Sequence, residues 1–108
     1  MDAETLKGHL DLLLLAAVES GGLHGYAIIE QLRRRSRGAF DLAEGTVYPA
    51  LHRLERGALL KSNWQPATAG ARRRRVYELT TRGRSALQTH QEEWRAFAQA
   101  VNAVLGGA

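Results

Sequence analysis

The chain has 108 residues, with 15 lysines and arginines against 11 acidic residues and a formal net charge of +4. This length suits a single domain, and 44% hydrophobic with 24% charged residues is the composition of a folded globular protein. The lack of cysteine excludes a disulfide scaffold, a cysteine-ligated zinc site and thiol catalysis. The longest strictly apolar run, Leu12 to Val18, is far shorter than a bilayer span, and Asp2 and Glu4 lie where a secretory signal carries positive charge. We therefore expect a cytoplasmic protein with no membrane partner.

Two helices are predicted in the first third of the chain. A helix of residues 6–19 has apolar residues at helical spacing over most of its surface, which predicts burial on most sides. The glycine pair after it marks its end. A second helix, residues 25–36, places Tyr26, Ile29 and Leu32 on one face and ends in consecutive arginines, which complement the helix dipole.

The third predicted helix, residues 44–56, is amphipathic. At about 100° per residue, Val47, Leu51 and Leu54 fall within a narrow apolar stripe, which Ala58 continues beyond the helix. The remaining surface is basic and hydrogen-bonding with an aromatic edge, and consists of Gly45, Thr46, Tyr48, Pro49, His52, Arg53 and Arg56. The helix therefore buries one face and offers the other to a partner.

A β-hairpin is predicted next, from strands at residues 59–65 and 74–79. In the second strand Tyr77 and Leu79 point to one side, and the residues that alternate with them point to the other. Trp64 is expected to pack on the hairpin or in the core. Four consecutive arginines give the hairpin a positively charged tip, namely Arg72, Arg73, Arg74 and Arg75. A solvated loop is the simpler explanation of this run when it is considered alone.

The last predicted helix, residues 81–105, carries an apolar seam. Its apolar residues recur at alternating steps of four and three, which is typical of a coiled coil rather than of a simple surface stripe. The seam consists of Leu87, Gln91, Trp94, Phe97, Ala98, Val101 and Leu105. It is too wide for the chain to cover alone, so we expect a second copy to pack there. This divides the chain into residues 1–80 and a dimerisation helix of residues 81–108.

Positive charge is concentrated in the middle of the chain. Residues 33–75 hold eleven basic and three acidic residues, a balance of +8, whereas the ends together are negative. Thirteen of the fifteen cations are arginine, which suits forked contacts with phosphate and guanine. Three helices followed by a basic hairpin describe a winged helix-turn-helix, a mainly α fold whose third helix enters the DNA major groove and whose hairpin wing lies along phosphates.

Short motifs are spread over nearly the full length of the chain. They are Leu23-His24-Gly25-Tyr26, the segment from Glu44 to Glu55, Trp64, the arginine run with Tyr77, Leu79 and Thr80, and Gly83-Arg84. Together they resemble the PadR family of transcriptional regulators, and residues 45–55 are the most specific block. With one long helix at its C-terminal end, the chain is similar to the short PadR subgroup.

The resemblance implies a homodimeric repressor that binds a palindromic operator in double-stranded DNA. It places Thr46, Tyr48, Pro49 and His52 on the recognition helix. It also places Tyr26 near a phosphate and the four arginines, Arg72 to Arg75, on the wing. Arg53 and Glu55 match the family's Arg-Leu-Glu, and either a DNA contact or local pairing is open to them.

Three positions depart from the family pattern. Ala58 stands where the family usually has glycine, and Gly57 precedes it, which predicts a helix that ends one residue early. Ala27 stands where glutamate is common. Glu78 stands where arginine or lysine is common, and this change weakens the positive field of the wing.

Trp94 has two interpretations. In some relatives a tryptophan of this helix lines a pore between subunits that takes flat aromatic compounds, which implies a small aromatic effector. Alternatively Trp94 only anchors the dimer, because tryptophan is enriched at interface hot spots.

Enzymatic functions find no support in the sequence. The four histidines lack metal-ligand spacing, and no Gly-x-Ser-x-Gly or phosphate-loop motif occurs. We expect no catalytic residue, no metal and no cofactor. The rival function is a winged-helix module that binds RNA or another protein, without a preference for palindromic duplex DNA.

Overall fold

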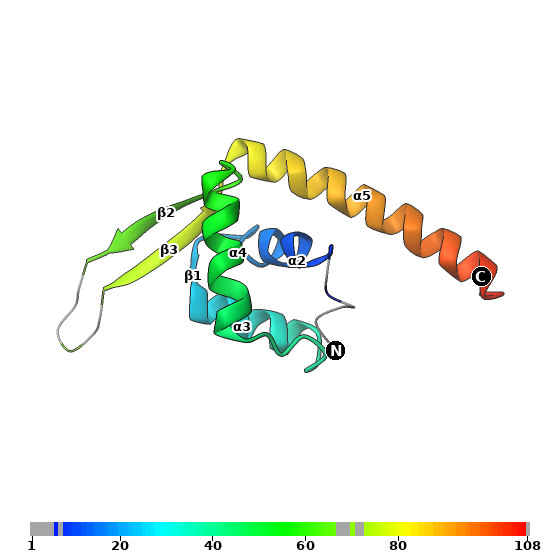
Figure 1. Cartoon of the computed structure of the whole chain (residues 1–108), viewed down its shortest axis with the longest axis horizontal. Helices are drawn as coiled ribbons and strands as arrows, with labels where there is room; N and C mark the ends of the chain where they lie inside the picture. Colours follow the sequence, from blue (N-terminus) through cyan, green and yellow to red (C-terminus); the bar gives the residue numbers. More distant parts are fainter. Residues whose placement is uncertain (1–5, 7, 67–69, 71–72, 108) are drawn as a thin grey trace.

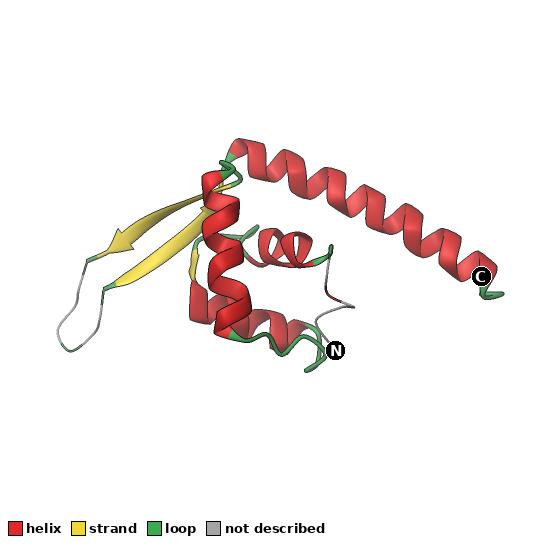
Figure 2. Ribbon diagram, viewed as in Figure 1, coloured by secondary structure: helices red, strands yellow, loops and turns green. Residues whose placement is uncertain are grey.

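The computed structural model describes residues 6, 8–66, 70 and 73–107. Its elements are α2 (Leu10–Ala17), β1 (Leu23–His24), α3 (Gly25–Arg35), α4 (Glu44–Arg56), β2 (Leu60–Gln65), β3 (Arg74–Leu79) and α5 (Thr81–Val104). The first three helices pack together beside a small sheet, the hairpin of β2 and β3 extends to one end, and α5 runs toward the other end (Figures 1 and 2). The predicted winged helix-turn-helix with a long C-terminal helix is confirmed.

Most predicted boundaries agree with the structure, and α2 is the main exception. The predicted helix of residues 6–19 is shorter, because Gly8 has φ +88° and lies in a turn before Leu10. A left-handed residue of this kind does not continue a right-handed helix. Glycine supplies this conformation without strain, so the helix begins only after it.

The sheet has a third strand that the sequence analysis did not predict. β1 pairs antiparallel with β3, Leu23 opposite Tyr77 and His24 opposite Val76, and the strand order is β1-β3-β2. Two residues are too few to show the alternation on which strand prediction depends. This strand joins the start of α3 directly to the wing.

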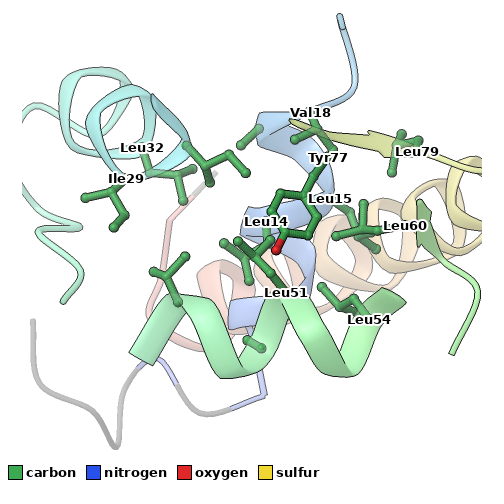
Figure 3. Packing of buried hydrophobic residues seen from close by; sticks show 14 of the residues in the cluster. Leu14, Leu15, Val18, Ile29, Leu32, Leu51, Leu54, Leu60, Tyr77 and Leu79 are labelled. Atoms are coloured by element: carbon green, nitrogen blue, oxygen red, sulfur yellow. The ribbon is translucent and has the colours of Figure 1, made fainter. Parts of the chain in front are cut away.

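The core lies where α2, α3, α4 and the sheet meet (Figure 3). Leu14 and Leu15 of α2, Leu51 of α4 and Tyr77 of β3 are almost completely buried. Tyr77 and Leu79 point to the same side of β3, as predicted, and both are buried in this core. On α3, Ile29 and Leu32 of the predicted face are buried together with Ile28, whereas Tyr26 is 56% exposed. The helix therefore turns its tyrosine toward solvent.

The start of α5 is fixed to the rest of the chain, and its later part projects away. The Thr80 hydroxyl accepts a hydrogen bond from the Gly83 N–H at 2.9 Å and donates one to the Ala58 carbonyl at 2.6 Å. Beyond Leu87, which is buried, the helix leaves the core (Figure 1). Among the residues described, no helix is long and apolar enough to cross a membrane.

Candidate nucleic-acid interface

Helix α4 presents the face that the sequence predicted for a partner. Its buried residues are Val47, Ala50, Leu51 and Leu54. Ala58 is not part of this apolar stripe, because it lies past the helix and is exposed. The exposed residues of the other face are Gly45, Thr46, Pro49, His52, Arg53 and Arg56.

Pro49 lies further inside α4 than a first-turn position. It is the sixth residue of a helix that begins at Glu44. Because proline has no N–H, the carbonyl of Gly45 receives no helical hydrogen bond from residue 49. Both residues are exposed, and Gly45 carries no side chain. A free backbone acceptor therefore adjoins the exposed face of α4.

Tyr48 is half-buried and joins α4 to the start of α3. Its ring lies so close to Gly25 that a Cβ at that position would come within 2.5 Å of Cε1. Only glycine allows this contact. The side chain of Tyr48 is thus held between two helices rather than extended into solvent like that of Tyr26.

Arg53 is held by α2. Its guanidinium makes a forked ion pair with Asp11, with Nη2 to Oδ1 at 2.6 Å and Nη1 to Oδ2 at 3.0 Å. These hydrogen bonds raise the pKa of Arg53 above its usual value. Of the two roles left open for Arg53, the structure shows pairing within the chain. The signal in the sequence was Asp11 itself, a lone acidic residue inside an apolar helix.

Glu55, Ser62 and Arg75 form a network between α4 and the wing. Arg75 Nε donates to Ser62 Oγ at 2.7 Å, and Ser62 Oγ donates to Glu55 Oε2 at 2.5 Å. Arg75 Nη2 lies 3.3 Å from both carboxylate oxygens of Glu55. The network fixes the angle between the wing and the end of α4. Arg75, predicted as a wing contact, therefore has a positioning role in the free protein.

The other wing residues surround an exposed tryptophan. Trp64 is 54% exposed, and the guanidinium carbons of Arg73 and Arg75 lie 5.2 Å and 5.8 Å from its ring centroid. These are cation–π distances. Trp64 thus packs on the wing rather than in the core. Arg72, also predicted to contact DNA, lies outside the described residues.

A cleft of about 320 Å³, which we call the wing cleft, lies between the start of α3, α4 and the wing. His24, Tyr26 and Tyr48 line it from the helical side, and Trp64 and Arg74 line it from the wing. Cations and aromatic rings in such a cleft suit a phosphate or a base. Tyr26, Tyr48 and Arg74 were predicted from the sequence as DNA-contacting residues. Trp64 and His24 were noted only as motif residues, and the place of His24 here depends on the unpredicted strand β1.

The predicted dimerisation seam divides into a buried and an exposed part. Leu87 is 1% exposed and packs in the core of its own chain, a role different from the interface that was predicted for it. The large exposed side chains of α5 lie beyond it and are Trp94, Phe97, Val101, Val104 and Leu105. Gln91 and Ala98 are half-buried on the same helix.

Trp94 also borders an apolar cleft of about 410 Å³ between α2 and α5. Its ring packs edge-on against His9, with centroids 5.4 Å apart, and tilted against Phe97 at 5.9 Å. Phe40 and Leu13 complete the wall. Phe40 carried no periodic signal because it lies in a loop. Across the described residues, no three metal-ligating side chains come together.

The exposed basic third helix and the arginine-bearing hairpin beside it define a winged helix-turn-helix protein of the DNA-binding class. Residues 14–89 match the Transcriptional regulator PadR-like family, and the chain belongs to this family of non-enzymatic regulators.

Named relatives cover nearly the whole chain. The chain is 40% identical over 104 residues to Transcriptional regulator Rv3488 of Mycobacterium tuberculosis, covering 96% of this chain and 90% of the relative. A PadR family transcription regulator from Clostridium difficile R20291 is 35% identical with TM-score 0.79, over 91% of this chain and 99% of that one. A transcriptional regulator from Clostridium thermocellum is 26% identical with TM-score 0.85, over 95% and 96%.

Proposed function

We propose that the protein is a homodimeric, sequence-specific repressor that binds a palindromic operator in double-stranded DNA in the cytoplasm. The observation that carries the proposal is the pairing of two surfaces. The exposed face of α4 offers hydrogen-bonding and basic side chains, and Ser62 and Arg75 hold the wing at a fixed angle beside it. One surface suits base edges and the other suits phosphates.

In this mechanism the recognition helix α4 lies in the major groove. Thr46, Tyr48, Pro49 and His52 face or border the bases, and the arginines of the wing contact the phosphate backbone. Phosphate contacts supply affinity that falls as salt rises, through counterion release, and base contacts supply the choice of sequence. Tyr26 lines the wing cleft, where its hydroxyl could reach a phosphate.

A second copy of the chain covers the exposed part of the α5 seam. Five large apolar side chains on one helix are costly to leave in water, at about 25 cal/mol per Å². A two-fold axis through α5 would present two recognition helices to half-sites one helical turn, ~34 Å, apart. The elongated protomer, 57 Å in its longest dimension, is long enough for this arrangement.

The apolar cleft beside Trp94 supports a role for a small, flat aromatic effector. The cleft is lined almost entirely by apolar and aromatic side chains, and its volume of about 410 Å³ falls in the range of small-molecule sites. An effector there would contact both α2 and α5. The competing role of Trp94 is to anchor the partner subunit.

Selection of bound sequences from a random duplex pool at physiological salt tests the proposed function. We expect an inverted repeat whose half-sites are centred about one turn apart, and a dimer by light scattering at the same salt. Tighter binding of single-stranded RNA than of duplex DNA in a parallel titration, or a monomer with no sequence preference, would instead support an RNA-binding or protein-interaction module. Repression is then tested by placing the selected sequence over a promoter.

A further inference from the structure

The imidazole of His24 lies between two hydrogen-bond donors. Its Nδ1 accepts the backbone N–H of Ala27 at 3.2 Å, which is the N-cap hydrogen bond of α3. Its Nε2 lies 2.9 Å from Nη1 of Arg74 in the wing. A guanidinium nitrogen of arginine only donates. Both ring nitrogens of His24 therefore face N–H groups.

One imidazole cannot accept both hydrogen bonds. The neutral ring has one nitrogen with a free lone pair, and the other carries a proton. With Nδ1 accepting from Ala27, the N–H of His24 Nε2 points at an N–H of Arg74. The other tautomer would accept from Arg74 but would leave the N–H of Ala27 facing a donor.

An acceptor group beside the two donors, with oxygens within hydrogen-bond distance of both, would resolve this conflict. Burial, and then the positive charge of Arg74, lower the pKa of His24, which favours the neutral ring. The hydrogen bond from the Ala27 N–H to Nδ1 then leaves the proton of the neutral ring on Nε2. The wing cleft, which His24 and Arg74 both line, provides space beside both groups. An oxygen that carries negative charge forms the stronger hydrogen bonds with a guanidinium.

We propose that His24 and Arg74 hold one phosphate of the DNA backbone, with the Nε2–H of His24 and a guanidinium N–H of Arg74 donating to its oxygens. This assignment rests on the proposed function and adds His24 to the DNA-contacting residues. It also gives Arg74 a defined target, in contrast to Arg75, which Glu55 and Ser62 hold.

The test combines a duplex selected by the wild-type protein with neutral methylphosphonate linkages placed one at a time. For the wild-type protein we expect one linkage in each half-site that weakens binding roughly tenfold or more, the loss of hydrogen bonds to a charged group. In the Arg74→Gln variant, the same methylphosphonate linkage should reduce affinity little further, because the arginine that contacts this phosphate is already missing. Arg34→Gln at the far end of α3 removes the same formal charge and should retain the full penalty.

Substitution of His24 separates its contact from its capping role. His24→Ser keeps a preferred N-cap residue but has no donor that reaches the phosphate. We expect roughly tenfold weaker binding that is uniform over operator variants, with an unchanged salt slope because a neutral group is lost. Arg74→Gln should instead reduce the slope by about one. The double variant should lose less affinity than the two single losses combined, because both groups hold one phosphate.

The outcomes distinguish this assignment from the proposed function. A wild-type protein that binds no duplex overturns both. A wild-type protein that binds its selected duplex, with no linkage whose penalty depends on Arg74, overturns the phosphate site alone. If His24→Ser does not fold, the linkage scan with Arg74→Gln still decides the question, because Arg74 plays no part in the helix cap.

Discussion

Arg53 on the recognition helix and Asp11 on α2 form a forked ion pair that spans 42 positions of the sequence. Arg53 has 54% of its side chain exposed, and Asp11 has 32%. An ion pair this exposed adds only ~0.2–1 kcal/mol to stability. Its greater effect is that Asp11 binds the guanidinium of Arg53, which lies on the face that we assign to DNA.

Release of Arg53 should therefore affect DNA binding more than folding. In Asp11→Asn we expect the free energy of unfolding to fall by less than ~1 kcal/mol. Affinity for the selected duplex should rise severalfold, with a salt slope steeper by about one, because one more cation reaches the phosphates. Titrations at several salt concentrations measure both. Arg53→Gln should abolish the gain, and an Asp11→Asn protein with unchanged affinity and slope would show that Arg53 is purely structural.

The turn after α4 contains removable strain at Ala58. Ala58 has φ +62°, whereas Gly57 has φ −79°, so the predicted one-residue shift does not occur and alanine occupies the left-handed position. This conformation costs a non-glycine residue roughly 1–2 kcal/mol. Ala58→Gly should raise the free energy of unfolding by ~0.5–1 kcal/mol after the added entropy of the unfolded chain is subtracted.

Urea unfolding at one fixed protein concentration measures this effect. Gly57→Ala is the matched comparison: a Cβ there would lie 3.6 Å from the Arg53 carbonyl oxygen, an ordinary contact. We expect it to stabilise by ~0.4–1 kcal/mol through the unfolded chain alone. A decrease in stability for Ala58→Gly would contradict the assigned strain.

Gly83 is required where α5 meets the wing. A Cβ at this position would overlap the carbonyl oxygen of Leu59, a backbone atom that the Thr80 N–H also contacts. Gly83→Ala should lower the free energy of unfolding by at least ~2 kcal/mol, because backbone cannot move aside as a side chain can. Gly45→Ala, with open space around it in α4, should instead stabilise by ~0.5–1 kcal/mol. If the two substitutions changed the free energy of unfolding equally, the close approach of Gly83 to the Leu59 carbonyl would be refuted.

Stability should depend on pH through His24. Folding lowers its pKa from the usual 6.5, by burial and by Arg74, so the unfolded chain binds the proton more readily. Its contribution is therefore present above pH 6.5 and is lost as pH falls through the lower pKa of the folded state. Between pH 7.5 and pH 5, stability should fall less steeply for His24→Ser than for the wild-type protein. Parallel curves would assign the pH dependence to other groups.

Trp94→Ala separates the effector site from the dimer anchor. If Trp94 binds an effector, planar hydrophobic compounds should quench tryptophan fluorescence in the wild-type protein. This quenching should disappear in a Trp94→Ala protein that is still a dimer. If Trp94 is only an anchor, the variant should become monomeric in light scattering at concentrations where the wild type is dimeric. Trp64→Phe removes the second tryptophan signal and serves as the control for both measurements.

The sequence predicted the helices and strands that are long enough to show a hydrophobic periodicity. The apolar stripe of α4 and the alternation around Tyr77 gave their boundaries, because periodicity reports directly on which residues face a core. Periodicity grouped Tyr26 with Ile29 and Leu32 without showing that its ring is exposed, since an aromatic residue at helical spacing fits either environment. The order of the elements was enough to predict the winged helix.

Contacts between distant residues were beyond the sequence analysis. Asp11 with Arg53, and His24 with Arg74, join segments whose proximity depends on how the elements pack, and no local pattern encodes it. The candidate residues on α4 were identified by its amphipathic pattern and by the family resemblance, and the wing arginines were identified by charge. Charge alone did not distinguish Arg75, which is held by Glu55, from Arg74, which faces the cleft.

The hydroxyl of Ser62 has a consequence for how such a regulator can change over evolution. It links Glu55 at the end of α4 to Arg75 in the wing. If α4 reads an operator as we propose, a change in operator sequence would be hard to match by turning the wing while α4 stays in place. New target sequences are then reached more easily by replacing side chains on the exposed face of α4. A new half-site spacing is reached more easily by changes in α5. Both are easier than a change in the hydrogen-bonded network around Ser62.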